Sequence, residues 1–243
     1  MKGRLYLVPN LLGVVPPGNV LPQKTIDVAR GLDRFIVENA KPARAFLKSL
    51  APSRPVADIG IAELGSDPAP ERVRELLAPA HAGGDMGLLS DAGCPGIADP
   101  GASIVAAAHD GGITVAPLVG PSAVLLALMA SGMNGQGFAF HGYLPVAAPA
   151  RAHAVRALEA DSQRTGHAQL FIETPYRNAT LLAALCETCR PETRLCVAAD
   201  LTLDSETVES RAIRGWRGRD FGGYAKRPAM FVLQALSARR GYR

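Results

Sequence analysis

The chain has 243 residues, of which 48% are hydrophobic and 20% charged, and its formal net charge is +4 at pH 7. This length suits one large or two modest domains, and the composition is typical of a soluble globular protein rather than a disordered one. The sequence lacks both an apolar run long enough to span a membrane and a signal-peptide pattern. We therefore expect a cytoplasmic protein without a membrane anchor.

Charge is distributed unevenly along the chain. Residues 1–120 carry 11 Lys/Arg against 12 Asp/Glu, or −1, whereas residues 121–243 carry 15 against 10, or +5. Four arginines fall within nine residues (Arg211, Arg214, Arg217 and Arg219). The positive charge of the second half favours an anionic partner such as RNA. On charge alone, a solvated arginine-rich strand and loop explains the same pattern equally well.

Strand-like and helical patterns alternate in the first half. Apolar runs at 5–8, 34–38, 88–91 and 114–119 predict buried strands, and segments 23–32, 41–50, 70–84 and 101–112 have helical spacing. Alternation of this kind predicts an α/β fold with a mainly parallel sheet covered by helices.

The pattern changes after an apolar helix predicted within residues 120–132, which we expect to be buried on every side. Beyond it, strands are expected within 138–145, 168–174, 194–202, 206–215 and 229–236, with helices within 148–163 and 176–189. Consecutive strands after Arg194 favour antiparallel pairing and a mixed sheet. We therefore expect an N-terminal α/β domain, 1–119, and a C-terminal α+β domain, 120–243.

Glycine- and proline-rich loops follow several of these strands. They read "VPNLLG" after the first strand, "SDAGCPG" from Ser90 and "VGPSA" from Val119, with "ETPYR" and "KRPAM" in the second half. Ligands of open α/β sheets bind beyond the carboxyl ends of the strands. Neither of the familiar phosphate-binding glycine motifs is present, so we expect a nucleoside-type ligand held mostly by backbone and small residues.

Few side chains in these loops indicate chemistry. Asp91 ends a buried strand and is a candidate acceptor for a ligand hydroxyl or amine, whereas Asp99 has the position of a turn or helix-capping residue. Glu173 ends another strand. The spacing of the acids does not favour a metal site, and Cys186 and Cys189 lie in a helical pattern that favours buried thiols over a zinc or redox centre.

In this order, the motifs resemble those of the tetrapyrrole-methylase superfamily of S-adenosylmethionine-dependent methyltransferases. Within it the chain is most similar to the ribosomal RNA small-subunit methyltransferase I type, which methylates a ribose 2′-hydroxyl. "SDAGCPGIADPG" matches the specific S-D-A-G-x-P-x-I-x-D-P-G pattern, and "GPSA" and "FAFHGYLP" are further matches. The resemblance implies two α/β domains, S-adenosylmethionine in the cleft between them, and a homodimer.

Carried over by position, the resemblance implies a set of residues in contact with the donor. They are Pro9, Gly13, Ser90, Asp91, Ala92, Gly93, Ser122, Ala123, Tyr143, Leu144, Thr174, Pro228 and Ala229. The chain departs from the ribosomal enzymes at Val37–Lys41, where "VENAK" replaces an "AEDTR" segment and retains only Glu38, and it has a shorter segment after the last strand. Both departures concern the acceptor rather than the donor.

We therefore expect a methyltransferase acting on ribosomal RNA, without a metal. A hydroxyl acceptor must lose its proton, and Asp91, Glu38 and Glu173 are the candidate bases. Arg177 and Arg214 are candidate substrate-binding residues. Two alternatives remain open: a methyltransferase acting on a tetrapyrrole-like or other small molecule, and a non-catalytic S-adenosylmethionine-binding module.

Overall fold

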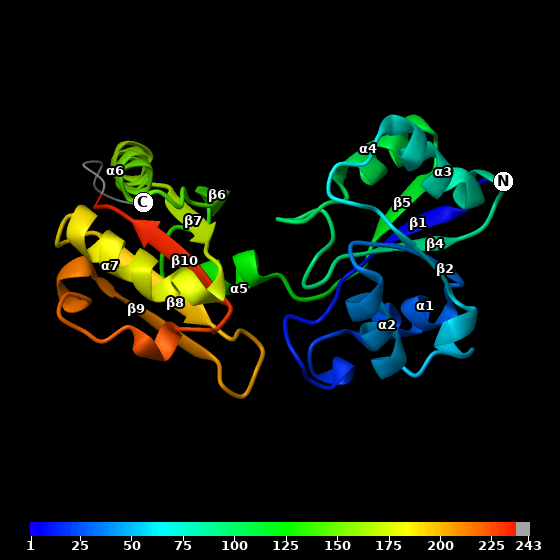
Figure 1. Cartoon of the computed structure of the whole chain (residues 1–243), viewed down its shortest axis with the longest axis horizontal. Helices are drawn as coiled ribbons and strands as arrows, with labels where there is room; N and C mark the ends of the chain where they lie inside the picture. Colours follow the sequence, from blue (N-terminus) through cyan, green and yellow to red (C-terminus); the bar gives the residue numbers. More distant parts are fainter. Residues whose placement is uncertain (237–243) are drawn as a thin grey trace. The chain divides into compact units, whose positions relative to one another are not determined.

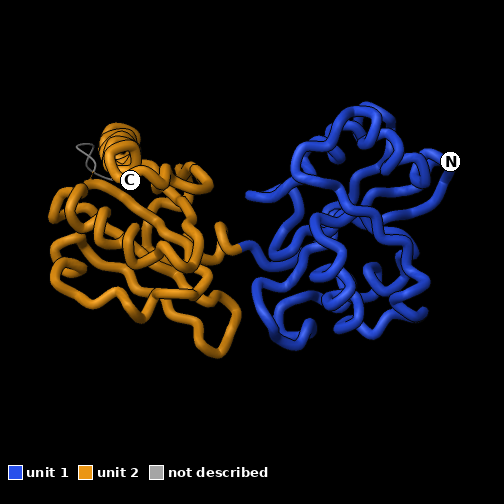
Figure 2. The backbone as a smooth tube through the Cα atoms, in the orientation of Figure 1, with its two compact units in different colours: residues 1–122 blue, residues 123–243 orange. Residues whose placement is uncertain are grey.

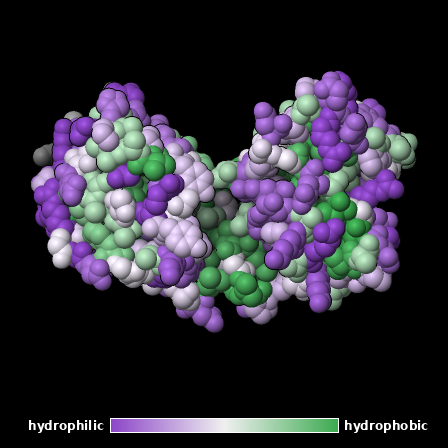
Figure 3. All heavy atoms as spheres, viewed as in Figure 1, coloured by the Kyte–Doolittle hydropathy of each residue, from purple (hydrophilic) through white to green (hydrophobic). Residues whose placement is uncertain are grey.

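The computed structural model describes residues 1–236, which form two compact units. The first spans Met1–Ser122 and the second begins at Ala123 (Figure 2). Within the described residues, no helix is both long enough and apolar enough to cross a membrane. On the face shown in Figure 3, each unit carries hydrophilic side chains over much of its surface, interspersed with smaller hydrophobic patches.

Unit 1 is built on a parallel sheet with the strand order β3-β2-β4-β1-β5. The strands are β1 (Arg4–Val8), β2 (Arg34–Val37), β3 (Gly60–Glu63), β4 (Met86–Leu89) and β5 (Thr114–Pro117). The helices are α1 (Gln23–Gly31), α2 (Ala40–Ser49), α3 (Pro70–His81) and α4 (Ala102–Asp110), with short 3-10 helices η1 (Pro17–Asn19) and η2 (Val56–Asp58).

Both faces of this sheet are covered, as Figure 1 shows. Val8 and Leu89 pack with residues of α1 and α2, whereas Leu5 and Leu88 pack with residues of α3 and α4. Successive strand residues point to opposite faces, so a strand buried on both sides must be apolar throughout. The expected parallel α/β arrangement is confirmed; the edge strand β3 was not predicted, because only Ile61 among its four residues is β-branched or aromatic.

Unit 2 contains a mixed sheet with the order β6-β7-β10-β8-β9, as expected. The strands are β6 (Phe138–Tyr143), β7 (Ala168–Ile172), β8 (Arg194–Ala199), β9 (Thr207–Ala212) and β10 (Ala229–Gln234). β6 and β7 are parallel, and the other neighbouring pairs are antiparallel. The helices are α5 (Ala123–Ser131), α6 (Ala148–Thr165) and α7 (Asn178–Thr188), with η3 (Pro175–Arg177), η4 (Ile213–Gly215) and η5 (Gly222–Tyr224).

The core of unit 2 lies between the sheet and α7, where the rings of Phe171 and Phe231 stack 5.7 Å apart and Trp216 is fully buried. The helix α5 contacts β8, β9 and β10. The prediction that α5 is buried on every side is wrong: Leu125 and Met129 are 52% and 78% exposed. An apolar sequence does not by itself tell which faces of a helix are buried, because that depends on which neighbouring elements pack against it.

Candidate functional site

Three loops of unit 1 lie side by side at the carboxyl edge of its sheet. They follow β1, β4 and β5, and β1 lies between the other two strands. The chain continues from β1 into α1 and from β4 into α4, two helices that pack on opposite faces of the sheet. Adjacent strands whose connections leave to opposite faces form the switch point at which open α/β sheets bind ligands.

Asn10 joins the first two loops. Its backbone N–H donates to the oxygen of Gly93 at 2.8 Å, and its side-chain Nδ2 donates to the oxygens of Ser90 and Asp91 at 3.0 and 2.9 Å. Asn10 is 5% exposed. Sequence reasoning selected Pro9 and Gly13 from this segment and missed Asn10, although a polar residue directly after a buried strand was a usable signal.

The third loop is packed against the first two. A Cβ on Gly120 would lie 2.3 Å from Cβ of Pro9, so only glycine allows this approach of the two backbones. The thiol of Cys94 lies 3.4 Å from the oxygen of Pro121. Gly93 has a φ of +68°, which favours glycine at the tip of the second loop. Ser122, another expected donor contact, follows Pro121 and is half-buried.

Carboxylates gather at this edge. Glu38 follows β2, and its Oε2 accepts from the backbone N–H of Asp91 at 3.2 Å. The carboxylate of Asp91 accepts from Nδ2 of Asn39 at 2.6 Å, so it is held to the loop after β2. The two candidate bases Asp91 and Glu38 are therefore neighbours, although 53 residues separate them in the sequence.

Asp99 belongs to the same group, and this was not expected. Burial raises its pKa to about 6, with Glu38 and Asp91 adding repulsion and a hydrogen bond from Ser90 acting in the opposite direction. The helix-capping role suggested by its position is wrong, because α4 begins after Gly101 and has no side-chain cap. Asp99 was missed because its neighbours come from other strands.

The edge suits a cationic ligand better than a phosphate. Glu38, Asp91 and Asp99 bring negative charge to it, and the hydrogen bonds found there come from backbone and amide groups rather than from lysine or arginine. Ile97 in the second loop and Val119 beside the third are 50% and 71% exposed, which adds apolar surface. Within the described residues, no group of three or more His, Cys, Asp or Glu could hold a metal ion.

In unit 2 the expected donor contacts fall on four segments. Tyr143 ends β6 and is 60% exposed, whereas the following Leu144 is buried. Thr174 follows β7, and Pro228 and Ala229 lead into β10. The backbone N–H of Lys226 donates to the oxygen of Pro175 at 3.0 Å, so the "ETPYR" and "KRPAM" loops are in contact. Ala123 is the first residue of α5.

Glu173 and Arg177 contact each other. Nη2 of Arg177 lies 2.7 Å from Oε1 of Glu173, which also accepts the backbone N–H of Thr174 at 2.6 Å. The side chain of Glu173 is 1% exposed. One residue was expected to act as a base and the other to bind substrate, but in the structure their charged groups bind each other and fix the turn before α7.

Most of the arginine-rich segment is engaged within unit 2. Arg211 and Arg219 both form ion pairs with Glu209 and both lie over the ring of Trp216, at 5.4 Å from its centroid. Arg217 donates to the oxygens of Cys186 and Cys189 at 3.0 and 3.1 Å, at the end of α7. These three arginines have structural partners, and the exposed Arg214 remains the best candidate for an external anion.

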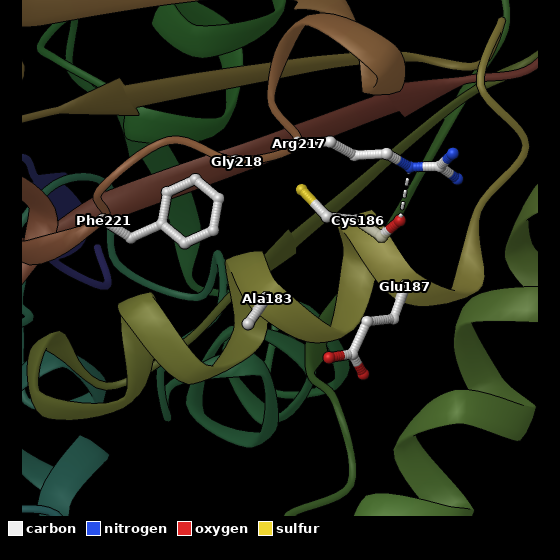
Figure 4. Close-up of a pocket in the computed structure, with 6 residues that line it drawn as sticks. All are labelled: Ala183, Cys186, Glu187, Arg217, Gly218 and Phe221. Carbon is white, nitrogen blue, oxygen red and sulfur yellow. Dashed lines mark hydrogen bonds between the residues drawn. The ribbon is translucent and has the colours of Figure 1, made fainter.

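A shallow cavity of about 520 Å³ lies on the α7 side of unit 2, lined by Ala183, Cys186, Glu187, Arg217, Gly218 and Phe221 (Figure 4). Arg217 already donates hydrogen bonds to the end of α7, so few of its N–H groups are free to bind a ligand in this cavity. Cys186, Cys189 and Cys196 are buried free thiols, and burial raises the pKa of Cys189 to about 12. These properties agree with packing rather than redox chemistry.

A doubly wound parallel unit with glycine-rich loops at its switch point, followed by a mixed-sheet unit, is the architecture of an α/β enzyme with a nucleoside-type ligand. Residues 13–214 match the model of the family Tetrapyrrole (Corrin/Porphyrin) Methylases, and the chain belongs to this family. Family membership assigns it to the S-adenosylmethionine-dependent methyltransferases.

Curated relatives are named Ribosomal RNA small subunit methyltransferase I. One from Escherichia coli O157:H7 is 28% identical over 87% of this chain and 70% of its own length, and one from Micromonospora olivasterospora is 34% identical over 84% and 61%. The chain thus spans only part of these longer relatives.

Solved structures show the same fold. Diphthine synthase matches with a TM-score of 0.65 at 14% identity, covering 95% of this chain and 89% of that one. Uroporphyrin-III C-methyltransferase from Thermus thermophilus, in complex with S-adenosylhomocysteine, matches with a TM-score of 0.54 at 19% identity, covering 96% and 97%.

Proposed function

We propose that this chain transfers the methyl group of S-adenosylmethionine to a ribose 2′-hydroxyl of ribosomal RNA. The observation that carries the proposal is the convergence of three glycine-rich loops and several carboxylates at one edge of the parallel sheet. S-adenosylmethionine carries a sulfonium cation and an ammonium group, and no phosphate. An anionic edge without a phosphate cradle complements such a ligand.

The donor contacts we propose come from loops of both units. In unit 1 they are Pro9, Gly13, Ser90–Gly93 and Ser122; in unit 2 they are Ala123, Tyr143, Leu144, Thr174, Pro228 and Ala229. The support is their placement in loops at strand ends, with backbone groups tied together by Asn10 and by the contact of Lys226 with Pro175. We propose further that the chain is cytoplasmic. We also propose that it acts as a homodimer, and a measurement of its mass in solution tests this oligomeric state.

S-adenosylmethionine supplies a methyl group that is already activated, so the protein's work is to align the acceptor and exclude water. The acceptor hydroxyl must also lose a proton. We propose that the group formed by Glu38, Asp91 and Asp99 accepts it, because these carboxylates lie together and burial raises the pKa of Asp99 to about 6. Glu173 is a weaker candidate because Arg177 and the Thr174 amide occupy its Oε1.

RNA as the acceptor is supported by the names of the curated relatives and by the exposed Arg214 in the positive half of the chain. Polyanion binding releases counterions, so we expect the affinity for RNA to fall steeply with salt. A small-molecule acceptor would show a weaker salt dependence.

The test is transfer of labelled methyl from S-adenosylmethionine to small ribosomal subunits and naked RNA that lack the modification. We expect incorporation at a ribose, at least tenfold slower for Asp91→Asn, with the exposed Asp67→Asn as the matched control. Donor binding without incorporation into any RNA would contradict the RNA assignment and favour a small-molecule acceptor or a non-catalytic module. No donor binding at all would contradict the whole proposal.

A further inference from the structure

Asn178, the first residue of α7, holds a loop that lies more than 40 residues further along the chain. Its Nδ2 donates to the backbone oxygens of Tyr224 and Arg227, at 3.1 and 2.7 Å. Asn178 is fully buried. A single side-chain amide therefore spans the turn formed by residues 224–227, just before Pro228 and Ala229.

The same turn is fixed from two other directions. The guanidinium of Arg227 donates to Oδ2 of Asp200 at 2.7 Å and to Oγ1 of Thr207 at 2.9 Å. The backbone N–H of Lys226 donates to the oxygen of Pro175, as described above. Three separate segments of unit 2 thus determine the conformation of this loop.

That conformation is one that an unconstrained chain avoids. Lys226 has a φ of +64°, and Asp200, which binds Arg227, has a φ of +53°. A non-glycine residue in the left-handed region costs on the order of 1 kcal/mol and persists where its surroundings over-determine it. The hydrogen bonds from Asn178 are part of what keeps Lys226 in this region.

Asn178 is itself costly to bury. Its Oδ1 has no hydrogen-bond partner among the described residues and is shielded from solvent. A buried acceptor without a partner is unfavourable, and an apolar residue would fill the same place without that cost. The gain lies in the two bonds donated by Nδ2, and both of them hold the loop before β10.

We propose that Asn178 is a positioning residue for the methyl donor: it presets the turn 224–227 so that the backbone at Pro228 and Ala229 is ready to bind S-adenosylmethionine. This inference rests on the function proposed above for that loop. The backbone N–H of Asp200 donates to the oxygen of Pro228 at 2.9 Å, so the braced turn and the proposed donor contact form one continuous unit. A preformed loop lowers the ordering cost of binding.

The test is the affinity for S-adenosylhomocysteine of Asn178→Asp and Asn178→Ala, measured by calorimetry over a pH series. Asn178→Asp keeps the shape but removes both donors and places a carboxylate against two carbonyl oxygens. We expect its Kd to rise about tenfold at pH 8. As the pH falls, protonation restores one donor, so its Kd relative to the unaltered chain should recover. Asn178→Ala should bind weakly at every pH.

Ser162 provides a matched control in the same unit. It is also fully buried, and its Oγ donates to the oxygen of His167 at 2.7 Å and accepts the N–H of Ala235 at 2.9 Å, beyond the opposite end of β10. Ser162→Ala should lower Tm but leave the Kd unchanged.

Any of three results would overturn the inference. The Asn178 variants could bind S-adenosylhomocysteine like the unaltered chain, or the Kd of Asn178→Asp could fail to recover on acidification. Ser162→Ala could also lose as much affinity as the Asn178 variants. Failure of the unaltered chain to bind S-adenosylhomocysteine would instead overturn the proposed function, and this inference with it.

Discussion

Arg177 is paired with Glu173 across four residues, with Nη2 2.7 Å from Oε1 and with the carboxylate almost fully withdrawn from solvent. The pair closes the turn between β7 and α7, the turn that also contains Thr174 and Pro175. Because the buried carboxylate has a cation and a backbone amide as partners, its charge is compensated locally. The turn that we propose to contact the donor is thus stabilised by two groups of opposite charge.

Removing one member of this pair should cost more than removing both. We expect Arg177→Ala to lower the free energy of unfolding by about 2 kcal/mol, because it leaves the buried carboxylate with a single partner. In Arg177→Ala/Glu173→Gln part of that loss should return. Urea unfolding of the two single variants and the double variant measures the coupling. Strictly additive effects would show that the pair contributes no interaction of its own.

Gly120 should not tolerate a side chain. Gly120→Ala places a Cβ at 2.3 Å from Pro9, a backbone-anchored ring that cannot rotate away. We expect a loss of about 1–3 kcal/mol in stability and weaker donor binding, measured by thermal unfolding and calorimetry. Gly18→Ala is the control, since a Cβ there meets no atom within 4 Å. Equal behaviour of the two variants would contradict the packing of the first and third loops.

Asp99 should make stability depend on pH in the direction opposite to that of most carboxylates. Its folded pKa of about 6 lies above its ordinary value of 3.8. The folded state therefore binds a proton at Asp99 more tightly than the unfolded state does. The stability that this proton contributes is lost as the pH rises from about 4 to 6. The stability of Asp99→Asn relative to the unaltered chain should rise over this window, by about 1 kcal/mol after allowing for partial exposure.

A titration by NMR provides a second check on Asp99. Because the charge of Glu38 contributes to the raised pKa, Glu38→Gln should move the pKa of Asp99 downward. An unchanged value in that variant would mean that the two carboxylates do not interact.

Arg214 and Arg217 should respond differently to replacement by alanine. Arg217 bonds two carbonyl oxygens at the end of α7, so Arg217→Ala should lower Tm. Arg214 is exposed, so Arg214→Ala should leave Tm unchanged while weakening RNA binding and reducing the salt slope by about one. Binding isotherms across a salt series, with melting curves on the same samples, separate these effects. An unaltered salt slope in Arg214→Ala would remove this residue from the RNA-binding surface.

The four thiols should react in a fixed order with a thiol reagent. Cys94 is half-exposed, whereas the other three cysteines are buried. Burial raises the pKa of all four thiols, to about 11 for Cys196 and about 12 for Cys189, so few thiolates form at neutral pH and exposure decides the order of reaction. We expect one thiol to react quickly in the native protein and three only on unfolding, and Cys94→Ser to remove the fast phase. Rapid modification of Cys186 and Cys189 would reopen a redox role for this pair.

The sequence by itself determined the type of fold. Apolar runs alternating with helical periods required a parallel sheet in unit 1, since a strand covered on both faces must be apolar at every position. It also singled out the loops that we propose to carry the site, because glycine and proline after a strand mark backbone of special geometry. The edge strand β3 escaped prediction, since only Ile61 among its four residues is of the β-branched or aromatic type that strands favour.

The tertiary structure alone decided which side chains act together. Burial, with added repulsion from Glu38 and Asp91, raises the pKa of Asp99, and Asn10 ties two loops whose residues lie about 80 positions apart. It likewise joined Asn178 to the turn 224–227 and bound three of the four clustered arginines to partners within unit 2. Local sequence patterns depend on the repeat of a helix or strand, whereas hydrogen bonds and pKa values depend on distances between segments that only the folded chain brings together.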